Sequence, residues 1–272
     1  MPKIRADLLV LARNLAQSRD EAARLILAGE IFLSPASPAA PPSRVNKAGD
    51  LLPEEAVIFR RAAGRYVGRG GYKLLGALEH FGIETHGLVA LDAGASTGGF
   101  TDCLLQRGAA KVYAADAGKG LLHEKLRRDS RVIPLEGVNL RLARPDLLPE
   151  LVDLITADLS FISLKAVLPS LRPLLKPGGG ILALIKPQFE AAKGVTVRGV
   201  LRDEALCRRV LEDLEAFAGE RLGLRPRGVI PATVKGAKGN QEYLAWWEDA
   251  VGAAFREVSV LPAGGPGAGQ PA

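Results

Sequence analysis

The residues with the clearest chemical potential lie in a glycine-rich run at residues 91–100, with the sequence LDAGASTGGF. Apolar residues come before the run and a helical pattern follows it, which predicts a turn between a strand and a helix. Backbone amides in such a turn can approach a ligand closely. The Gly-Lys-Ser/Thr ending of a Walker loop is absent, so triphosphate binding through that device is disfavoured. The remaining candidates for the ligand are a dinucleotide and S-adenosylmethionine.

A second candidate is Asp116, which ends the next predicted strand twenty-four residues after Asp92. A carboxylate at this place can accept hydrogen bonds from both hydroxyls of a ribose, as it also does in Rossmann dehydrogenases. The alternative is that the glycines form only a tight turn and that Asp116 caps it. Both features fall at the switch point of the predicted sheet, which favours ligand binding.

Two charged residues follow later apolar strands. Asp158 comes directly after residues 154–157, and Lys186 directly after residues 181–185. Open α/β sheets bind their ligands at the carboxyl ends of the strands. Desolvation or a nearby cation favours the neutral amine of a lysine, which can then accept a proton. Taken singly, Asp158 could instead be a helix N-cap and Lys186 a snorkelling surface residue.

Positioning these residues requires a parallel sheet, and the pattern from residue 88 onward predicts one. Short apolar strands alternate with helical segments, which is typical of a doubly wound, Rossmann-like α/β fold. The predicted strands are residues 89–91, 112–115, 132–135, 154–157 and 181–185, and the predicted helices are residues 99–107, 121–128, 164–175 and 203–217. Two further strands, around Val229 and at residues 243–247, predict a closing hairpin.

The first sixty residues predict a separate, small α+β module. Apolar spacing indicates two short helices within residues 5–28, the second one capped by Ser18 with Glu21 as its capping-box partner. Gly29 ends that helix, and strands are expected at residues 30–33 and 56–60. The Pro-rich residues 34–43 between them are expected to hold no regular structure.

Two basic stretches predict contact with a polyanion. Residues 60–73 hold five cations and no acid, interleaved with glycines, and residues 221–238 hold five more cations and no acid. The chain carries a formal net charge of +6. A solvated basic face is the usual alternative, but interleaved glycine favours close backbone contact with phosphate.

Composition excludes several classes of protein. Of 272 residues, 47% are hydrophobic and 24% are charged, as in ordinary globular proteins. No apolar run reaches the length of a membrane span, and Lys3, Arg5 and Asp7 interrupt the start of the chain, so a cytoplasmic protein without membrane contact is expected. Two cysteines are too few for a disulfide framework or a zinc site.

Five separated motifs carry a resemblance to a known family. They are GRGGYK at 68–73, DAGASTGGFTDC at 92–103, ADLSFIS at 157–163, IKPQFE at 185–190 and GNQE at 239–242. In this order they closely resemble the TlyA family of ribosomal RNA 2′-O-methyltransferases, which also carries the name haemolysin A. The resemblance extends to about residue 260. It implies a catalytic domain similar to the FtsJ-type methyltransferases and an N-terminal domain similar to the RNA-binding fold of ribosomal protein S-four.

The resemblance also implies the reacting groups: Lys73, Asp158, Lys186 and Glu242. Lys186 would help to remove the proton from a ribose 2′-hydroxyl, that of a cytidine in 16S or 23S ribosomal RNA. Asp158 would lie close to this lysine and to the methyl donor, while Lys73 and Glu242 would orient the group and balance its charge. No metal is expected.

Cofactor contacts follow from the same resemblance, whereas RNA contacts follow from the two basic stretches and from cations on the N-terminal helices. S-adenosyl-L-methionine is expected against Gly94, Ser96, Gly98, Phe100, Asp116 and Asp158, with Asn139 as a weaker adenine-side candidate whose alternative role is a cap. Ribosomal RNA, free or in a subunit, is expected against Arg5, Arg19, Arg24, Arg65, Arg69, Lys235 and Lys238.

These expectations divide the chain into four parts and leave two other functions to weigh. The parts are the S-four-like domain at 1–60, a basic linker and entry helix at 61–87, the methyltransferase domain at 88–260, and a disordered tail at 261–272. The Pro-rich residues 34–43 depart from the family pattern, which has a compact hairpin there. A membrane-active haemolysin lacks support from any basic amphipathic helix with large aromatics. A nicotinamide-dependent dehydrogenase lacks a suitably spaced catalytic histidine.

Overall fold

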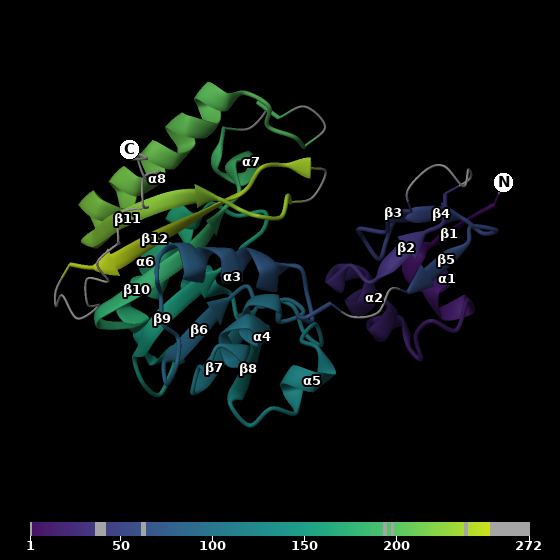
Figure 1. Cartoon of the computed structure of the whole chain (residues 1–272), viewed down its shortest axis with the longest axis horizontal. Coiled ribbons are helices and arrows are strands. Elements are labelled where there is room, and N and C mark those ends of the chain that lie inside the picture. The colour runs from purple at the N-terminus through teal and green to yellow at the C-terminus, as the bar shows by residue number, and fades with distance from the viewer. Residues whose placement is uncertain are drawn as a thin grey trace, which may run out of the picture.

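The computed structural model describes residues 2–35, 42–60, 64–192, 195–196, 199–236 and 239–250. A small N-terminal part lies beside a larger α/β part (Figure 1). Each has its own apolar core, and the two large cores of the α/β part cover opposite faces of one sheet. The expected disordered tail at 261–272 lies outside the described residues.

Outside residues 36–41, which the structure does not describe, the N-terminal part holds two helices and five short strands. They are β1 (Lys3–Arg5), α1 (Ala6–Ala12), α2 (Arg19–Ala28), β2 (Ile31–Leu33), β3 (Ser43–Arg44), β4 (Leu51–Pro53) and β5 (Ile58–Arg60). Strand β1 pairs with β4, and a second sheet has the order β3-β2-β5. The predicted Ser18 N-cap is confirmed, because Ser18 Oγ accepts from Glu21 N at 3.2 Å. Glu21 Oε2 accepts from Gln17 N at 2.7 Å, one residue before the N-cap amide that a capping box would use.

Two expectations about this part need correction. Strands β1 and β4 were not predicted, because three residues are too few to show a period of two. The prediction of no regular structure through residue 43 is wrong at its end, since Ser43 pairs with Leu33 in the β2–β3 ladder. Residues 36–41 of the Pro-rich segment lie outside the described part of the chain.

The α/β part contains the predicted doubly wound sheet. Its seven described strands have the order β11-β12-β10-β9-β6-β7-β8. The five strands β10, β9, β6, β7 and β8 are parallel, and β12 pairs antiparallel with both β10 and β11. The strands are β6 (Val89–Ala93), β7 (Lys111–Asp116), β8 (Val132–Glu136), β9 (Val152–Ala157), β10 (Leu175–Ile185), β11 (Leu224–Pro231) and β12 (Tyr243–Asp249). The Rossmann-like fold class is therefore confirmed.

Helices cover both faces of this sheet (Figure 1). Helices α3 (Gly70–His80), α4 (Gly99–Gln106) and α5 (Glu124–Arg127) contribute to one core, which includes Ala90 of β6. Helices α6 (Leu168–Leu171) and α8 (Glu204–Leu222) contribute to the other, which includes the neighbouring Leu91. A further short helix, α7 (Pro187–Glu190), follows β10. Alternate residues of a strand thus reach opposite cores, as the pleat requires.

Two predicted helices are shorter than expected. The helix predicted at 164–175 is wrong as a continuous element: it consists of a 3₁₀ turn at Leu164–Ala166, then α6, then a 3₁₀ turn at Arg172–Leu174. Pro169 and Pro173 lack the amide that a continuous helix would need at those positions. The helix predicted at 121–128 begins only at Glu124, after His123 caps its first turn. Within the described residues, no helix is both long and apolar enough to cross a membrane.

Candidate active site

The glycine-rich turn connects β6 to α4 with a backbone that only glycine adopts freely. Gly94 has φ +88°, and a Cβ there would lie 2.6 Å from the Asp158 carbonyl oxygen. Gly98 has φ +94°, and a Cβ there would overlap the Leu126 side chain. Both the positive φ and the close approach exclude larger residues. The turn therefore packs directly against the segment that follows β9 and against α5.

Asp116 lies where the sequence predicts it, at the carboxyl end of β7. One oxygen of its carboxylate accepts from Ser96 N at 2.8 Å, and the other accepts from Gly118 N at 2.7 Å. These two bonds fix the orientation of the carboxylate, and each oxygen keeps acceptor capacity for a ligand hydroxyl. Ser96 itself has φ +49°, so the turn holds a non-glycine residue in the left-handed region to make this contact.

A cavity of about 480 Å³ adjoins this carboxylate. Its walls combine the charged Asp116 with apolar side chains, a composition that suits a nucleoside. Lining residues include Leu27, Gly94, Ser96, Asp116, Leu121, Val138, Asn139, Leu140, Asp158, Ser160 and Phe161. Asn139 lines the cavity. Its side chain also accepts from Arg141 N at 3.1 Å and caps the following 3₁₀ turn, which is the alternative role that the sequence allowed.

A second, smaller cavity of about 180 Å³ collects the expected reacting groups. Lys73 of α3, Asp158 after β9 and Lys186 after β10 all line it. Gly94, Ser96, Asp158, Ser160 and Leu27 line both cavities, so the two spaces adjoin. Phe100, at the start of α4, lines the smaller one.

The four expected reacting residues form two ion pairs. Lys186 Nζ lies 2.7 Å from Asp158 Oδ1 and donates to Ser160 Oγ at 2.7 Å. Lys73 Nζ lies 2.5 Å from Glu242 Oε2. Lys186 and Lys73 are 9% and 7% exposed and Glu242 is 3% exposed, so these three charges are largely shielded from water, where electrostatic effects are strong. Glu242 lies behind Lys73 and does not line either cavity.

Asp92 is a buried acid beneath this site that the sequence analysis did not single out for a role. It accepts from Thr101 N at 2.9 Å and from Thr101 Oγ at 2.6 Å, which ties the end of β6 to α4. Burial raises the pKa of Asp92 to about 7, and the charge of Asp158 adds to this rise. The only indication of this role in the sequence is the position of Asp92 near the end of a strand, at the start of the glycine-rich run.

Glu190 and Ser160 connect the segment after β9 to the segment that follows β10. Glu190, at the end of α7, accepts from Ser163 Oγ at 2.6 Å and from Leu164 N at 2.8 Å. Burial raises the pKa of this carboxyl. Ser160 fixes Lys186, as described above. Both lie within the quoted motifs, but only the folded loops show their contacts.

An aromatic side chain stands exposed at the mouth of the larger cavity. Phe161 is 85% exposed and has φ +64°, a conformation that costs free energy for a bulky residue. Its ring lies 5.0 Å from that of Phe189 on α7. An exposed aromatic face held in strained backbone at a cavity is typical of a binding surface rather than of a core.

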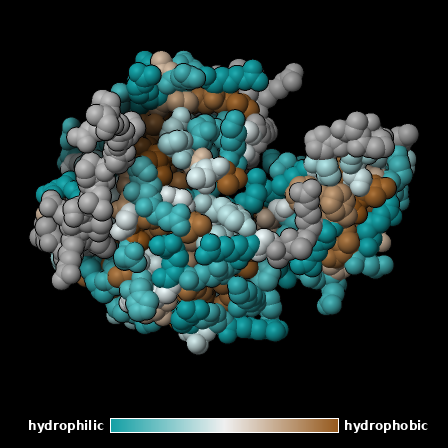
Figure 2. Space-filling view, viewed as in Figure 1, coloured by the Kyte–Doolittle hydropathy of each residue, from teal (hydrophilic) through white to brown (hydrophobic). Residues whose placement is uncertain are grey.

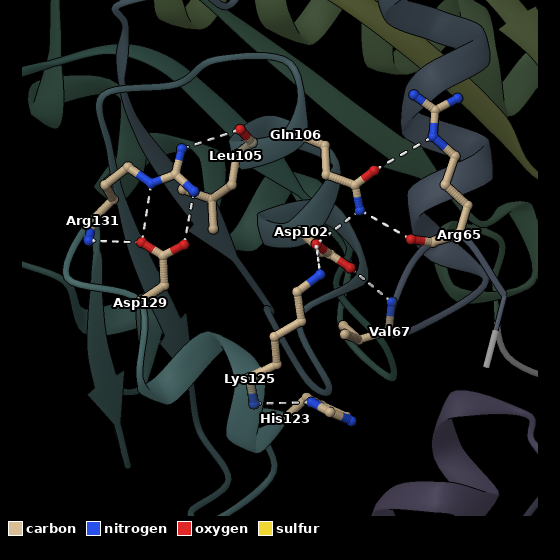
Figure 3. Close-up of polar contacts among 9 residues, drawn as sticks. All are labelled: Arg65, Val67, Asp102, Leu105, Gln106, His123, Lys125, Asp129 and Arg131. Carbon is tan, nitrogen blue, oxygen red and sulfur yellow. Dashed lines mark hydrogen bonds and ion pairs between the residues drawn. The ribbon is translucent and has the colours of Figure 1, made fainter.

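The basic stretch before α3 is anchored rather than free. Asp102 of α4 accepts from Val67 N at 2.9 Å, Gln106 Nε2 at 3.0 Å and Lys125 Nζ at 3.2 Å (Figure 3). Gln106 also donates to the Arg65 carbonyl at 2.9 Å, while the Arg65 guanidinium lies near the Gln106 amide oxygen (Figure 3). The chain between Arg65 and α3 is thereby fixed to the helix that follows the glycine turn.

The other cations expected to contact RNA have varied surroundings. Arg5 and Arg19 both pair with the buried Asp7, at 2.8 and 2.9 Å. Arg24 Nη1 donates to the Gly120 carbonyl at 3.1 Å and so connects α2 to the loop after β7. Lys235 is exposed. Arg69 lines the smaller cavity. Lys238 lies outside the described residues.

Comparisons with known proteins agree with this geometry. A profile of the FtsJ-like methyltransferases matches residues 66–248. The chain is 42% identical to the 16S/23S rRNA (cytidine-2′-O)-methyltransferase TlyA of Mycobacterium tuberculosis, over 90% of this chain and 89% of the relative. It is 36% identical to Hemolysin A of Brachyspira hyodysenteriae, over 89% of this chain and 98% of the relative.

A solved structure extends the similarity to the fold. The chain is similar to the solved structure of a protein from Streptococcus thermophilus that is named as a hemolysin. The two match with a TM-score of 0.69 and 38% identity, over 92% of this chain and 89% of that one. Matches in sequence and in structure thus span the N-terminal part as well as the α/β part. The chain belongs to the FtsJ-like methyltransferase family, among relatives named TlyA and Hemolysin A.

Proposed function

We propose that this protein transfers a methyl group from S-adenosylmethionine to a ribose 2′-hydroxyl of ribosomal RNA, that of a cytidine in 16S or 23S RNA. The observation that carries the proposal is the adjoining pair of cavities. One presents the Asp116 carboxylate and apolar walls suited to adenosine, and the other holds Lys186, Asp158 and Lys73. Relatives that share most of the chain bear the corresponding name.

The residues present fit the methyl donor. Asp116 is oriented to accept hydrogen bonds from ribose hydroxyls, and the glycine turn leaves room for close backbone approach. Residues that line both cavities, such as Gly94 and Ser96, lie where the adenosine and methionine portions would join. When bound, the sulfonium supplies an electrophilic methyl group to the smaller cavity.

Lys186 is the group that handles the proton. A neutral ribose hydroxyl is a poor nucleophile, so its proton must leave as the oxygen attacks the methyl carbon. In the proposed reaction, the Lys186 ammonium of the ion pair would first release a proton to solvent. The hydroxyl proton would then move to the neutral Nζ as the oxygen forms its bond to the methyl carbon, and the methyl donor would leave as a neutral thioether. Asp158 and Ser160 hold this amine in place, and the nearby cation Lys73 stabilises the charge that develops on oxygen.

Lys73 depends on Glu242 for its charge and position. A buried ammonium without a partner would be strongly disfavoured, and the 2.5 Å pair with Glu242 provides that partner. Lys73 lines the smaller cavity and Glu242 does not, so the ion pair holds the ammonium at the cavity wall. We assign Lys73 and Glu242 to orientation and charge balance, and Asp158 to positioning of Lys186.

Phe161 supports an RNA substrate. Proteins that act on single nucleotides in RNA stack unpaired bases on exposed aromatic rings. Phe161 presents such a ring at the larger cavity, next to Ser160, which lines both cavities. Basic residues around the same region supply sequence-independent attraction to phosphate. We place this enzyme in the cytoplasm with ribosomal RNA or ribosomal subunits as its partner.

The test is transfer of tritiated methyl from S-adenosylmethionine to ribosomal subunits taken from a strain that lacks this modification. Alkaline hydrolysis of the product distinguishes the target atom, because a 2′-O-methyl group blocks cleavage at that nucleotide. We expect label and a new resistant position. Label without resistance would indicate a base methyltransferase. Absence of label, combined with dye release from anionic liposomes, would favour the membrane-active alternative that the haemolysin name suggests.

A further inference from the structure

The N-terminal part forms one wall of the smaller cavity. Leu27 of α2 and Arg44 of β3 line it together with Lys73 and Lys186. The space-filling view shows the N-terminal part as a separate lobe, with a notch between it and the α/β part (Figure 2). The Arg24 contact to Gly120 holds α2 at this boundary. Residues from both parts of the chain therefore surround the place where the substrate ribose must lie.

Arg44 has an unusual environment for a cation. Its Nη2 donates to the carbonyls of Leu27 and Ile26, at 3.1 and 3.4 Å, which fixes the guanidinium over the end of α2. Its Nε and Nη1 are buried and have no hydrogen-bond partner. Burial and, to a smaller extent, the charge of Arg69 lower the pKa of Arg44 to about 10. The side chain stays cationic at neutral pH while two of its nitrogens lack acceptors, which is costly in a protein.

Arg69 brings a second guanidinium to the same cavity. It directly precedes α3, and partial desolvation lowers its pKa. The acid that favours its charged form is Glu242, whose carboxylate pairs with Lys73. Among the described residues, neither Arg44 nor Arg69 takes part in an ion pair. Two guanidinium groups thus lie close together without a carboxylate of their own.

We infer that Arg44 and Arg69 form an oxyanion subsite between the two parts of the chain, and that a phosphate of the RNA backbone beside the target ribose occupies it. The inference rests on the proposed function, since a ribose at Lys186 brings its flanking phosphates into this cavity. Guanidinium groups bind phosphate oxygens with paired, charge-assisted hydrogen bonds. The unpartnered nitrogens of Arg44 are covered by protein, and the guanidinium packs against Gly29. Contact between these nitrogens and a phosphate would therefore require the guanidinium to turn from Gly29 toward the cavity.

The same chemistry has one other source, the carboxylate of the methionine portion of the methyl donor. The position of Arg44 favours phosphate. It lines the smaller cavity but not the larger one, and it belongs to the part of the chain expected to bind RNA. Phosphate contacts fix the register of a nucleic acid on a protein, so this subsite would place the ribose rather than read the base.

The test compares Arg44→Ala, Arg44→Lys and Arg69→Ala with the full-length protein. Arg13→Ala is the matched control, because Arg13 lies in the same part of the chain, donates to the Glu54 carbonyl at 2.9 Å and lines neither cavity. Methyl transfer to ribosomal subunits gives KM and kcat at several salt concentrations. Calorimetry gives the Kd for S-adenosylmethionine without RNA, and thermal unfolding reports whether each variant is folded.

For Arg44→Ala we expect KM for RNA to rise about ten- to a hundredfold, the effect of one lost charge-assisted contact. The slope of log KM against log salt should fall by about 0.7 to 0.9, because one phosphate contact is lost. Arg44→Lys should keep that slope and recover part of the affinity. The Kd for S-adenosylmethionine should stay within about twofold of wild type, and Arg13→Ala should match wild type throughout.

Each other outcome overturns part or all of the inference. A weaker Kd for S-adenosylmethionine with an unchanged RNA KM would overturn the phosphate assignment and identify the methionine carboxylate as the occupant. Wild-type behaviour of both Arg44→Ala and Arg69→Ala would overturn the subsite itself. If Arg44→Ala is unfolded, Arg69→Ala carries the same test. If the wild-type protein transfers no methyl group, the proposed function fails first, and RNA filter binding at several salt concentrations then tests the subsite alone.

Discussion

Lys186 depends on the loop after β9 as much as on its own strand. Its ammonium contacts Asp158 Oδ1 and Ser160 Oγ, both at 2.7 Å, and both partners belong to that loop. A lysine side chain has four rotatable bonds, so without these partners the amine would sample many positions. The two oxygens therefore decide where the proton acceptor lies in the proposed reaction.

This arrangement gives a first prediction. Lys186→Ala should lower kcat by about 10²- to 10⁴-fold, the usual contribution of a positioned proton acceptor. S-adenosylmethionine should still bind within a fewfold of wild-type affinity. Ser160→Ala, which removes one of the two contacts that position the amine, should lower kcat by about two- to tenfold. Single-turnover methyl transfer and calorimetry measure these effects, and near-normal turnover of Lys186→Ala would refute the role assigned to Lys186.

Asp92 gives a second prediction, on stability. Its pKa is about 7 in the folded chain and about 3.9 when unfolded, so unfolding releases its proton between these values. The free energy of unfolding should therefore fall as pH rises from about 4 to 7, by up to about 1.4 kcal/mol per pH unit.

Asp92→Asn separates this effect from other titrations. Asparagine keeps an oxygen that can accept from Thr101 but does not titrate, so the pH dependence in that window should flatten. Urea unfolding at several pH values between 4.5 and 7.5 measures the slope for both proteins. Equal slopes would show that Asp92 titrates normally.

At the scale of elements, Glu190 joins two loops of the candidate active site. One follows β9 and carries Asp158, Ser160 and Phe161, while the other follows β10 and carries Lys186. The contacts of Glu190 with Ser163 and Leu164 span the gap between them. The relative position of Asp158 and Lys186 is thus fixed from both ends of the loop, by their own ion pair and by Glu190.

Glu190→Ala should therefore impair catalysis without unfolding the protein. We expect kcat to fall about tenfold, with a smaller change in the Kd for S-adenosylmethionine, because the loop loses two hydrogen bonds. Glu190→Gln, which keeps one carbonyl acceptor, should recover part of the rate. Rapid kinetics and calorimetry on the pair of variants test this. Equal damage in both would mean that the carboxylate charge matters rather than the loop anchor.

The elements also show what the sequence could and could not reveal. Long periodic strands and the ends that carry Asp158 and Lys186 were predictable, because the carboxyl edge of a parallel sheet follows from chain order. The broken helix around α6 was not, since apolar spacing outweighed Pro169 and Pro173 in the prediction. Glu242 precedes an antiparallel strand, so only family resemblance pointed to it. The contacts of Ser160, Glu190 and Arg44 depend on loop geometry that no periodic pattern encodes.

At the scale of the whole molecule, the N-terminal part has an independent core and its own pH response. Asp7 is buried there between Arg5 and Arg19, and hydrogen bonds from Arg5 and then Arg19 lower its pKa to about 2. A carboxyl with a lowered pKa contributes stability above its unfolded pKa of about 3.9, and this stability is lost as pH falls toward 2.

We therefore expect acid to destabilise the N-terminal part through Asp7. Asp7→Asn should cost this part about 1 to 2 kcal/mol at neutral pH and remove its acid sensitivity in this window. Hydrogen exchange of amides in α1 and α2, measured at about pH 4.5 and about pH 2.5, either side of the unfolded pKa, localises the effect. Uniform loss of protection across the α/β sheet would contradict an independent response.

The contribution of Leu27 to both cavities limits how this enzyme can be rearranged by evolution or by engineering. The family profile begins at residue 66, yet part of the cavity wall comes from α2, nearly forty residues earlier. A chimera that joins residues 66–248 to a foreign RNA-binding module would inherit the reacting groups but not this wall. Modular exchange in this lineage must therefore preserve the surface of the donated module as well as its affinity for RNA.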